Sequence, residues 1–313
     1  MSQNYKYGLI VHRHKKEVNI GDYIQAIAVK QALGVDDFVL FDREDLANYK
    51  GEPLRMVGQG WYCHGEGAWP PASQIDYLPL GIHINPQSHA HFLKPTSMEA
   101  LNRLAPIGCR DMMTYEFLQQ HNVNSYFSGC MTVTLQPSNI PRKPEKIYLI
   151  DVGRAAIKLL PKHMQDLPVV ELSHLLPHPE GRVWEHDELF KIAQERLDLY
   201  YSTAAVVITS RIHALMPSMA MGIPCIWVER RLLDRRLELA RRYAFPHILA
   251  CPDRLPPILK RIMEKFAHPL ISLFYTLSKP SANERLTPLM DMKAERIRIL
   301  GELNSAMKRL GWK

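Results

Sequence analysis

Short apolar runs alternate with segments of helical spacing along the first half of the chain. In residues 22–34, apolar positions recur as in an amphipathic helix, and Gly34 ends the pattern where a left-handed residue is common. The runs predict strands over 7–13, 37–42, 54–61, 79–84 and 107–111. Helices are predicted over 97–105, with Ser97 as the cap, and directly after 111. This alternation predicts a parallel, doubly wound α/β sheet.

The same alternation restarts in the second half of the chain. Residues 135–146 are rich in proline and charge, which is typical of a linker. After it, strands are predicted over 146–152, 169–176, 206–210 and 224–229, and helices over 187–204 and 211–222. We therefore predict two Rossmann-like domains, 1–140 and 146–313, with a cleft between them. The helical region from about residue 256 is expected to cap the second domain or to cross back onto the first.

Composition places the chain among globular proteins. It has 313 residues, of which 46% are hydrophobic and 23% are charged. No apolar run reaches the roughly 18 residues of a membrane span, and the N-terminus does not resemble a signal peptide. We expect a cytoplasmic protein. The five cysteines form no CxxC pair and are expected to be reduced and mostly buried, and we see no metal site.

Charge favours anionic partners. The chain carries 39 Lys and Arg against 32 Asp and Glu, a net charge of +7. Basic residues cluster in 229–243 and 293–313. Each cluster can bind an anionic partner, or it can simply be the solvated face of a helix. No helix-turn-helix, zinc knuckle or aromatic-interleaved basic ribbon is present, so nucleic acid is not an expected partner.

Polar residues follow the first predicted strand where ligands bind in open parallel sheets. Asn19, Gly21 and Asp22 stand directly before the first helix. Gly21 permits close backbone approach, and Asp22 can cap the helix. A capped loop is the simpler interpretation of these three residues.

A second polar group ends the strand at 107–111. Arg110 and Asp111 terminate that strand, and Thr114 lies in the first turn of the next helix. Arg110 and Asp111 can bind an anion and a hydroxyl, or they can simply pair with each other.

The most specific pattern is Thr209-Ser210-Arg211-Ile212-His213. Here a buried strand passes directly into a helix. A helix N-terminus offers free N–H groups and a partial positive charge, which suits an anion. Arg211 adds a planar fork that fits a carboxylate or a phosphate, and His213 can exchange a proton near neutral pH. Since a cation at this end of a helix is unfavourable without an anion, Ser210, Arg211 and His213 predict an anion site.

These motifs together resemble the polysaccharide pyruvyl transferase family. The ordered set is "NIGD", "GCRD..T" and "ITSRIHA…GIP", with similarity also in "GWYCHG…WPP", "GIHI" and "FSGCMTVTL". The resemblance implies a GT-B-like pair of facing Rossmann-like domains. It also implies phosphoenolpyruvate as the donor, a sugar diol as the acceptor, and Arg211 and His213 as the donor-site Arg-x-His. The chain departs from the family in the stretch Gly58-Gln59-Gly60-Trp61, where many relatives resemble Asn-Gly-Trp. This departure concerns an acceptor contact at Gln59.

The implied reaction assigns roles to the candidate residues. Arg211, Ser210 and the helix N-terminus would hold one anionic group of the donor, and Arg110 would hold the other. His213 would be the acid, and Asp22 or Asp111 the base toward a sugar hydroxyl. His83 is an alternative base, and with Asn19, Gly21, Asp111 and Thr114 it forms the predicted acceptor side. No cofactor is expected beyond phosphoenolpyruvate as co-substrate.

Other functions compete with this hypothesis. One is a GT-B glycosyltransferase that uses a nucleotide sugar, although no glycine-rich diphosphate loop is evident. Another is a non-catalytic glycan-binding protein. The acceptor can be lipid-linked, and the amphipathic segment 293–313 with Trp312 suits contact with an anionic inner-membrane face. Packing of that segment on the first domain is the alternative.

Overall fold

The computed structural model describes residues 6–63, 65–229, 234–244, 246–247 and 286–312. Its first sheet has the strand order β3-β1-β4-β5-β6-β7, and all neighbours run parallel. The strands are β1 (Lys6–Val11), β3 (Phe38–Asp42), β4 (Leu54–Tyr62), β5 (Ile75–Ile84), β6 (Ile107–Cys109) and β7 (Ser125–Phe127). The five strands predicted for this half are confirmed, whereas β7 was not predicted.

The helices that follow these strands are α1 (Gly21–Leu33), α2 (His89–Phe92), α3 (Pro95–Leu104) and α4 (Met112–Gln120). As predicted, Gly34 ends α1 in the left-handed conformation, with φ +65°. Two predicted caps are wrong. Ile20 is the N-cap of α1, so Asp22 lies inside the first turn. Helix α3 begins at Pro95, because proline suits a first helical position. Ser97 therefore lies inside the helix and not at its cap, and its side chain is buried.

The second sheet has the order β13-β12-β11-β8-β9, also parallel throughout. Its strands are β8 (Lys146–Ile150), β9 (Val169–Leu172), β11 (Ala204–Thr209), β12 (Cys225–Val228) and β13 (Pro246–His247). The helices are α5 (His186–Thr203), α6 (Ile212–Ala220) and α7 (Glu238–Tyr243), and short 3₁₀ segments complete both halves. The chain is thus a mixed α/β protein with two Rossmann-like parallel sheets. Residues 136–145, between the sheets, form no helix or strand, in agreement with the predicted linker.

The predicted strand 169–176 is wrong in one respect, because it splits at Ser173. The side chain of Asp151 accepts hydrogen bonds from the Ser173 hydroxyl and the His174 N–H, and these turn the chain away from the sheet. The continuation, β10 (Leu175–Pro177), pairs antiparallel with β2 (Glu17–Asn19) of the first half. This two-stranded ribbon joins the two halves beside the start of α1.

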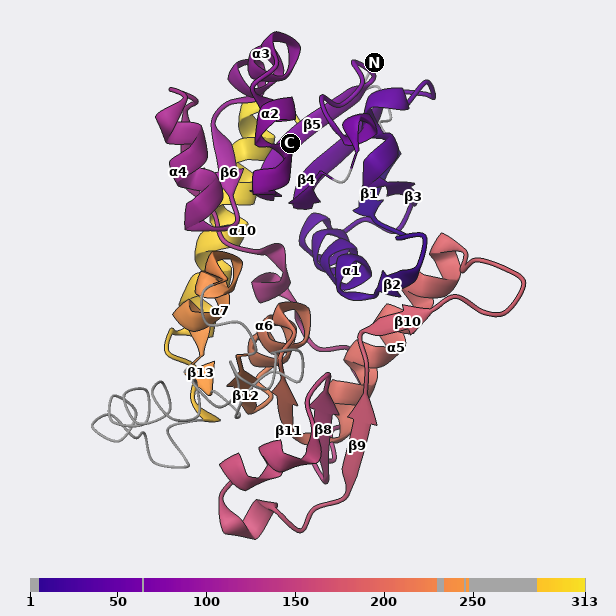
Figure 1. Cartoon of the computed structure of the whole chain (residues 1–313), viewed down its shortest axis with the longest axis vertical. Helices are drawn as coiled ribbons and strands as arrows, with labels where there is room; N and C mark the ends of the chain where they lie inside the picture. Colours follow the sequence, from indigo (N-terminus) through magenta and orange to yellow (C-terminus); the bar gives the residue numbers. More distant parts are fainter. Residues whose placement is uncertain (1–5, 64, 230–233, 245, 248–285, 313) are drawn as a thin grey trace, which may run out of the picture.

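Both sheets contribute to a shared hydrophobic core. Helices α1, α5 and α6 lie between the sheets (Figure 1), and their buried side chains belong to one contiguous cluster that includes Ile24, Leu197 and Leu215. Burial of this kind stabilises the fold by about 25 cal/mol per Å² of apolar surface. The two halves are therefore in extensive apolar contact. The GT-B arrangement, with an open cleft between facing domains, stays a prediction.

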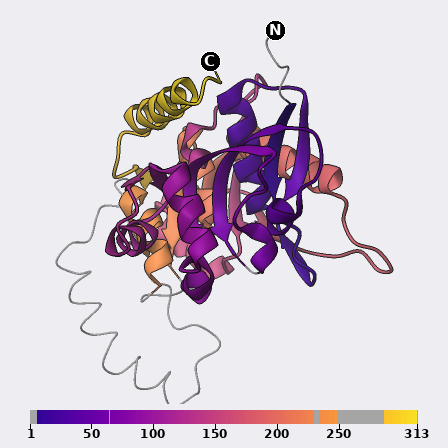
Figure 2. The same cartoon turned by 90° about the horizontal axis from the view of Figure 1, so that it is seen from above.

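Helix α10 (Met292–Arg309) crosses back onto the first half of the chain, as one of the two alternatives predicted. It lies along one side of the molecule (Figure 2) and buries Ile299 and Leu303 in the shared core. Trp312 is 6% exposed, packs edge-on to Tyr7, and donates a hydrogen bond to Asp76 at 2.5 Å. The expectation that Trp312 suits a membrane interface is therefore wrong, because the protein interior holds its ring.

Two other expectations concern cysteines and membrane spans. Cys63, Cys109, Cys130 and Cys225 are free and buried, as predicted, while Cys251 lies outside the described residues. In the described part of the chain, none of the helices has the length and apolar character needed to cross a membrane. The predicted helical region from about 256 also lies outside the described residues as far as 285, as do Arg230 and Arg231.

Candidate active site

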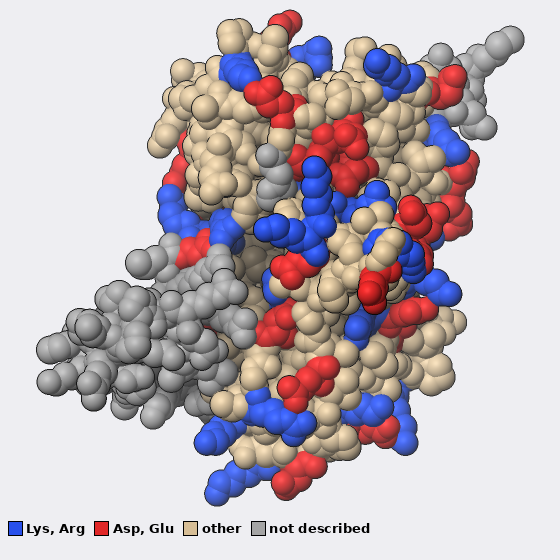
Figure 3. All heavy atoms as spheres, turned by 45° about the vertical axis from the view of Figure 1, so that its right-hand side comes forward, with Lys and Arg blue, Asp and Glu red and all other residues tan. Residues whose placement is uncertain are grey.

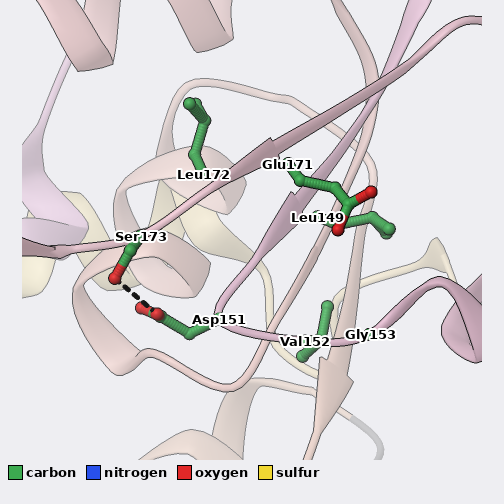
Figure 4. A pocket seen from close by; sticks show the side chains of 7 residues that line it. All are labelled: Leu149, Asp151, Val152, Gly153, Glu171, Leu172 and Ser173. Carbon is green, nitrogen blue, oxygen red and sulfur yellow. Dashed lines mark hydrogen bonds between the residues drawn. The ribbon is translucent and has the colours of Figure 1, made fainter.

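A cavity of about 460 Å³ opens at the carboxyl ends of β8 and β9 (Figure 4). On the other side of β8, between β8 and β11, the strand order reverses, and parallel sheets bind ligands at such a switch point. Polar groups from both strands line the cavity. The residues are Leu149, Asp151, Val152, Gly153, Glu171, Leu172 and Ser173.

Arg211 is held at the edge of this region by an ion pair. It is the N-cap of α6, and its Nε lies 2.7 Å from Oδ2 of Asp151. Although burial raises the pKa of Asp151, hydrogen bonds from Ser173 and the His174 N–H, together with Arg211, lower it overall. Asp151 is therefore an anion that balances Arg211. This partner was missed in the sequence, although it stands at the end of a predicted strand.

His213 points to a different group of residues. A Cβ on Gly21 would lie 2.8 Å from Nδ1 of His213, so only glycine fits without a shift. The Gly21 N–H donates to the Asn19 side chain at 3.1 Å, and Cys130 Sγ lies 4.0 Å from Nε2 of His213. The structure thus brings Asn19 and Gly21 against His213. Arg211 makes its ion pair elsewhere, because it is the N-cap residue with extended backbone, whereas His213 lies in the first turn of α6.

The His213 imidazole is neutral in the free protein. Burial lowers its pKa well below the usual value, and the positive charge of Arg110 and the nearby His174 lower it further. His174 is itself buried, and burial lowers its pKa to about 3. His213 can therefore become charged at neutral pH only if an anion is brought close to it.

Arg110 is a buried cation with weak local compensation. The residue is 6% exposed, and its Nε lies 3.8 Å from Asp111 Oδ2, beyond hydrogen-bond distance. Within the described part of the chain, its guanidinium makes no hydrogen bond. Because a buried charge is costly unless paired, this geometry favours an anionic ligand between Arg110 and His213.

Asp111 is engaged with its other neighbours. Its Oδ2 lies 2.6 Å from Nδ1 of His83, and its Oδ1 accepts from the N–H and the hydroxyl of Thr114, both at 3.0 Å. It thereby caps α4. Burial raises the pKa of Asp111, but the hydrogen bond from His83 leads the interactions that lower it overall. Burial is also the main cause that lowers the pKa of His83. His83, Asp111 and Thr114 thus form one buried unit.

Asp22 faces a fourth polar group. It accepts a hydrogen bond from Gln25 at 3.2 Å and lies 3.8 Å from Arg43, which is 2% exposed. Both partners also lie beside Gly60 of β4. Neither Gln25 nor Arg43 was found in the sequence. Gln25 lies inside a predicted helix, and only the fold shows that Arg43, directly after β3, is its neighbour.

Metal-binding side chains do not gather in the described residues. No group there of three or more His, Cys, Asp or Glu could hold a metal ion. The predicted site residues instead fall into four groups, around Arg211, His213, His83 and Asp22, with Arg110 within electrostatic reach of both histidines.

One comparison with known proteins identifies a family. Residues 19–231 match the family model described as polysaccharide pyruvyl transferase. No match was found among the curated proteins. Among solved structures, an uncharacterised protein from Klebsiella pneumoniae subsp. pneumoniae is 12% identical, with a TM-score of 0.44, over 79% of this chain and 93% of that chain.

Proposed function

Given that the chain belongs to the polysaccharide pyruvyl transferase family, and is therefore a transferase with a saccharide acceptor, we propose that its donor is phosphoenolpyruvate and its product a pyruvate ketal. The ketal would bridge two hydroxyls of one sugar in a surface polysaccharide or its precursor. The observation that carries the choice of donor is the buried, incompletely paired Arg110 beside His213.

Phosphoenolpyruvate suits this arrangement because it carries a phosphate and a carboxylate. Arg110 would bind one of these anionic groups through charge-assisted hydrogen bonds. The N-terminus of α6 and Ser210 would bind the other anionic group. Arg211, at the edge of the site, would give up its ion pair with Asp151 and bind the donor instead. A trianionic donor also brings the negative charge that favours protonation of His213.

The reaction then balances with two proton transfers. His213 would protonate the methylene carbon of the donor, which leaves an oxocarbenium-like centre at the adjacent carbon. The first hydroxyl forms a C–O bond there, phosphate leaves with its bridging oxygen, and the second hydroxyl closes the ketal. One hydroxyl proton leaves on hydrogen phosphate, and the other replaces the proton that His213 gave. Asn19 and Gly21 place the acceptor side against His213, and Asp22 is a candidate base.

The test is direct chemistry. The protein is incubated with phosphoenolpyruvate and a panel of oligosaccharides, and mass spectrometry follows the pyruvate ketal while phosphate release is measured. Ketal formation that requires both substrates is expected. Transfer from a uridine-diphosphate sugar, with no ketal from phosphoenolpyruvate, would instead identify a glycosyltransferase. Saccharide binding without turnover of either donor would identify a glycan-binding protein.

A further inference from the structure

Three buried polar atoms near the carboxyl ends of β4 and β5 have no hydrogen-bond partner within the described residues. They are Oε1 of Gln25, Oε1 of Gln59 and Nε2 of His83. These residues are 2%, 3% and 0% exposed, respectively. Buried polar atoms nearly always have partners, and each unpaired one costs free energy. Three of them on adjoining elements point to a ligand.

The three side chains belong to, or lie beside, residues 59–61 of β4. Gln59 belongs to this stretch, and the amide of Gln25 lies 3.8 Å from the position of a Cβ on Gly60. The next residue, Trp61, pairs with His83 in the parallel register, with ring centroids 5.1 Å apart. Helix α1 and strands β4 and β5 therefore place the three residues at the carboxyl-terminal edge of the first sheet, where β4 and β5 end. Parallel sheets bind their ligands at this edge.

All three atoms are hydrogen-bond acceptors. The amide nitrogen of Gln25 donates to Asp22, which leaves its carbonyl oxygen unpaired. Nδ1 of His83 lies 2.6 Å from the Asp111 carboxylate, which can only accept, so Nδ1 carries the proton and Nε2 has a free lone pair. The matching ligand must donate several hydrogen bonds. A polyhydroxyl compound does so, whereas the trianionic donor does not.

We propose that this edge is the acceptor subsite, in which Gln25 and Gln59 receive hydroxyl hydrogens of a sugar diol and His83 is the general base for its first attack. The inference rests on the proposed function and gives the base role to His83 instead of Asp22. As the hydroxyl oxygen bonds to the ketal carbon, its proton passes to Nε2. His83 then returns to the neutral form by giving this proton to the departing phosphate.

Asp111 and Thr114 act as positioning residues in this scheme. Asp111 fixes the tautomer and the ring orientation of His83, and Thr114 donates to the same carboxylate while it accepts the N–H of Ile84. Trp61 lies edge-on to His83, and the guanidinium of Arg236 lies 4.7 Å from the centre of the Trp61 ring. Trp61 and Arg236 therefore border the ring of His83.

The test compares Gln25→Leu, Gln59→Leu and His83→Gln with Ser97→Ala, whose hydroxyl is also buried and unpaired but lies in α3. The acceptors are methyl glucopyranoside, methyl galactopyranoside and methyl mannopyranoside. Each leucine variant should raise the acceptor KM about tenfold without changing the phosphoenolpyruvate KM or lowering stability. His83→Gln should lower kcat by about 10²–10⁴. Ser97→Ala should change none of these kinetic constants.

Unchanged acceptor KM in both leucine variants, or wild-type kcat in His83→Gln, would overturn the proposal. Should His83→Gln fail to fold, Asp111→Asn replaces it, because asparagine can still cap α4 but reverses the preferred tautomer. If the wild-type protein forms no ketal, the proposed function fails, and thermal stabilisation by the same methyl glycosides tests the subsite alone. Stabilisation of the wild-type protein but not of Gln59→Leu supports the subsite. No stabilisation, or equal stabilisation of both, overturns it.

Discussion

Two arginines that look alike in the sequence differ in how their charge is balanced. Arg211 is paired with Asp151 at 2.7 Å, whereas Arg110 is buried with its nearest carboxylate oxygen at 3.8 Å. A ligand that binds Arg211 must first compete with an existing ion pair. A ligand that binds Arg110 meets a buried guanidinium whose ion pair with Asp111 is beyond hydrogen-bond distance. We therefore expect Arg110 to contribute more to donor affinity.

Replacing Arg110 with methionine tests this directly. Loss of hydrogen bonds to a charged group costs about 1.5–3 kcal/mol, so the phosphoenolpyruvate KM should rise by one to two decades. The free energy of unfolding should not fall, since a poorly paired buried charge is removed. Steady-state kinetics and urea unfolding measure the two effects. Arg235→Met, at an exposed ion pair with Glu116, is the control, and a donor KM equal to that of the control would exclude Arg110 from the site.

His213→Gln should separate binding from chemistry. Glutamine keeps a polar side chain but cannot act as an acid, so kcat should fall by about 10²–10⁴ while phosphoenolpyruvate still binds. Isothermal titration calorimetry measures the binding, and single-turnover kinetics measure the chemistry. Loss of binding together with an unchanged rate at saturation would instead make His213 a ligand contact.

Among the elements, α10 shows how an amphipathic pattern can be read in two ways. Its basic residues and apolar positions suit a membrane surface, but Ile299, Leu303, Ala306 and Met307 are all buried in the shared core. Arg296 also donates to the carbonyl oxygens of Leu135 and Ala220, which come from different halves of the chain. The helix therefore ties the two halves together.

The packing of α10 predicts unequal effects for two apolar residues on the same helix. Leu303→Ala removes a fully packed side chain and should lower the free energy of unfolding by about 2–5 kcal/mol. Ile297 is 63% exposed, so Ile297→Ala should change it by less than about 0.5 kcal/mol. Urea unfolding of both variants measures the difference. Equal effects would show that α10 is not packed in this way.

Over the whole molecule, the surplus positive charge does not form one continuous area on the face in Figure 3, where basic and acidic side chains are interspersed. On α10, Ile297 remains exposed, as does Leu310 just after the helix. We expect no co-sedimentation with phosphatidylserine vesicles at physiological salt, because two apolar side chains and a mixed charge pattern attract a membrane weakly. Salt-sensitive binding that Ile297→Ser or Leu310→Ser abolishes would contradict this expectation.

Buried histidines predict the pH dependence of stability. Burial lowers the pKa of His83, His174 and His213 in the folded protein, so below the ordinary pKa of 6.5 the unfolded chain binds protons that the folded chain does not. The free energy of unfolding should therefore fall as pH falls through 6.5 and should continue to fall toward the folded pKa of His174, about 3. Urea titrations from pH 8 to 5 measure this, and His213→Gln should flatten the profile. A flat wild-type profile would contradict it.

The sequence by itself determined the helices and strands and showed that the candidate site residues follow the carboxyl ends of the strands. Strand–helix alternation, Gly34 at a helix end and the polar residues after each strand are local properties, so their prediction needed no knowledge of neighbours. The strand after Pro168 was misread because the turn at Ser173 depends on Asp151, more than twenty residues earlier in the chain. The motifs also located Arg110, His83 and His213 without showing which of them face one another.

Only the tertiary structure decided those partnerships. Arg211 and His213 are two residues apart, yet one pairs with Asp151 and the other packs on Gly21, because Arg211 has the extended backbone of the N-cap and His213 lies within the helix. Within the part of the chain that the structure describes, folding likewise left the acceptor atoms of Gln25, Gln59 and His83 buried and without hydrogen-bond partners. Pairing, burial and the resulting pKa shifts depend on distances between residues far apart in the chain. The sequence specifies which residue types stand at each strand end, and only the packing of the fold sets the distances between them.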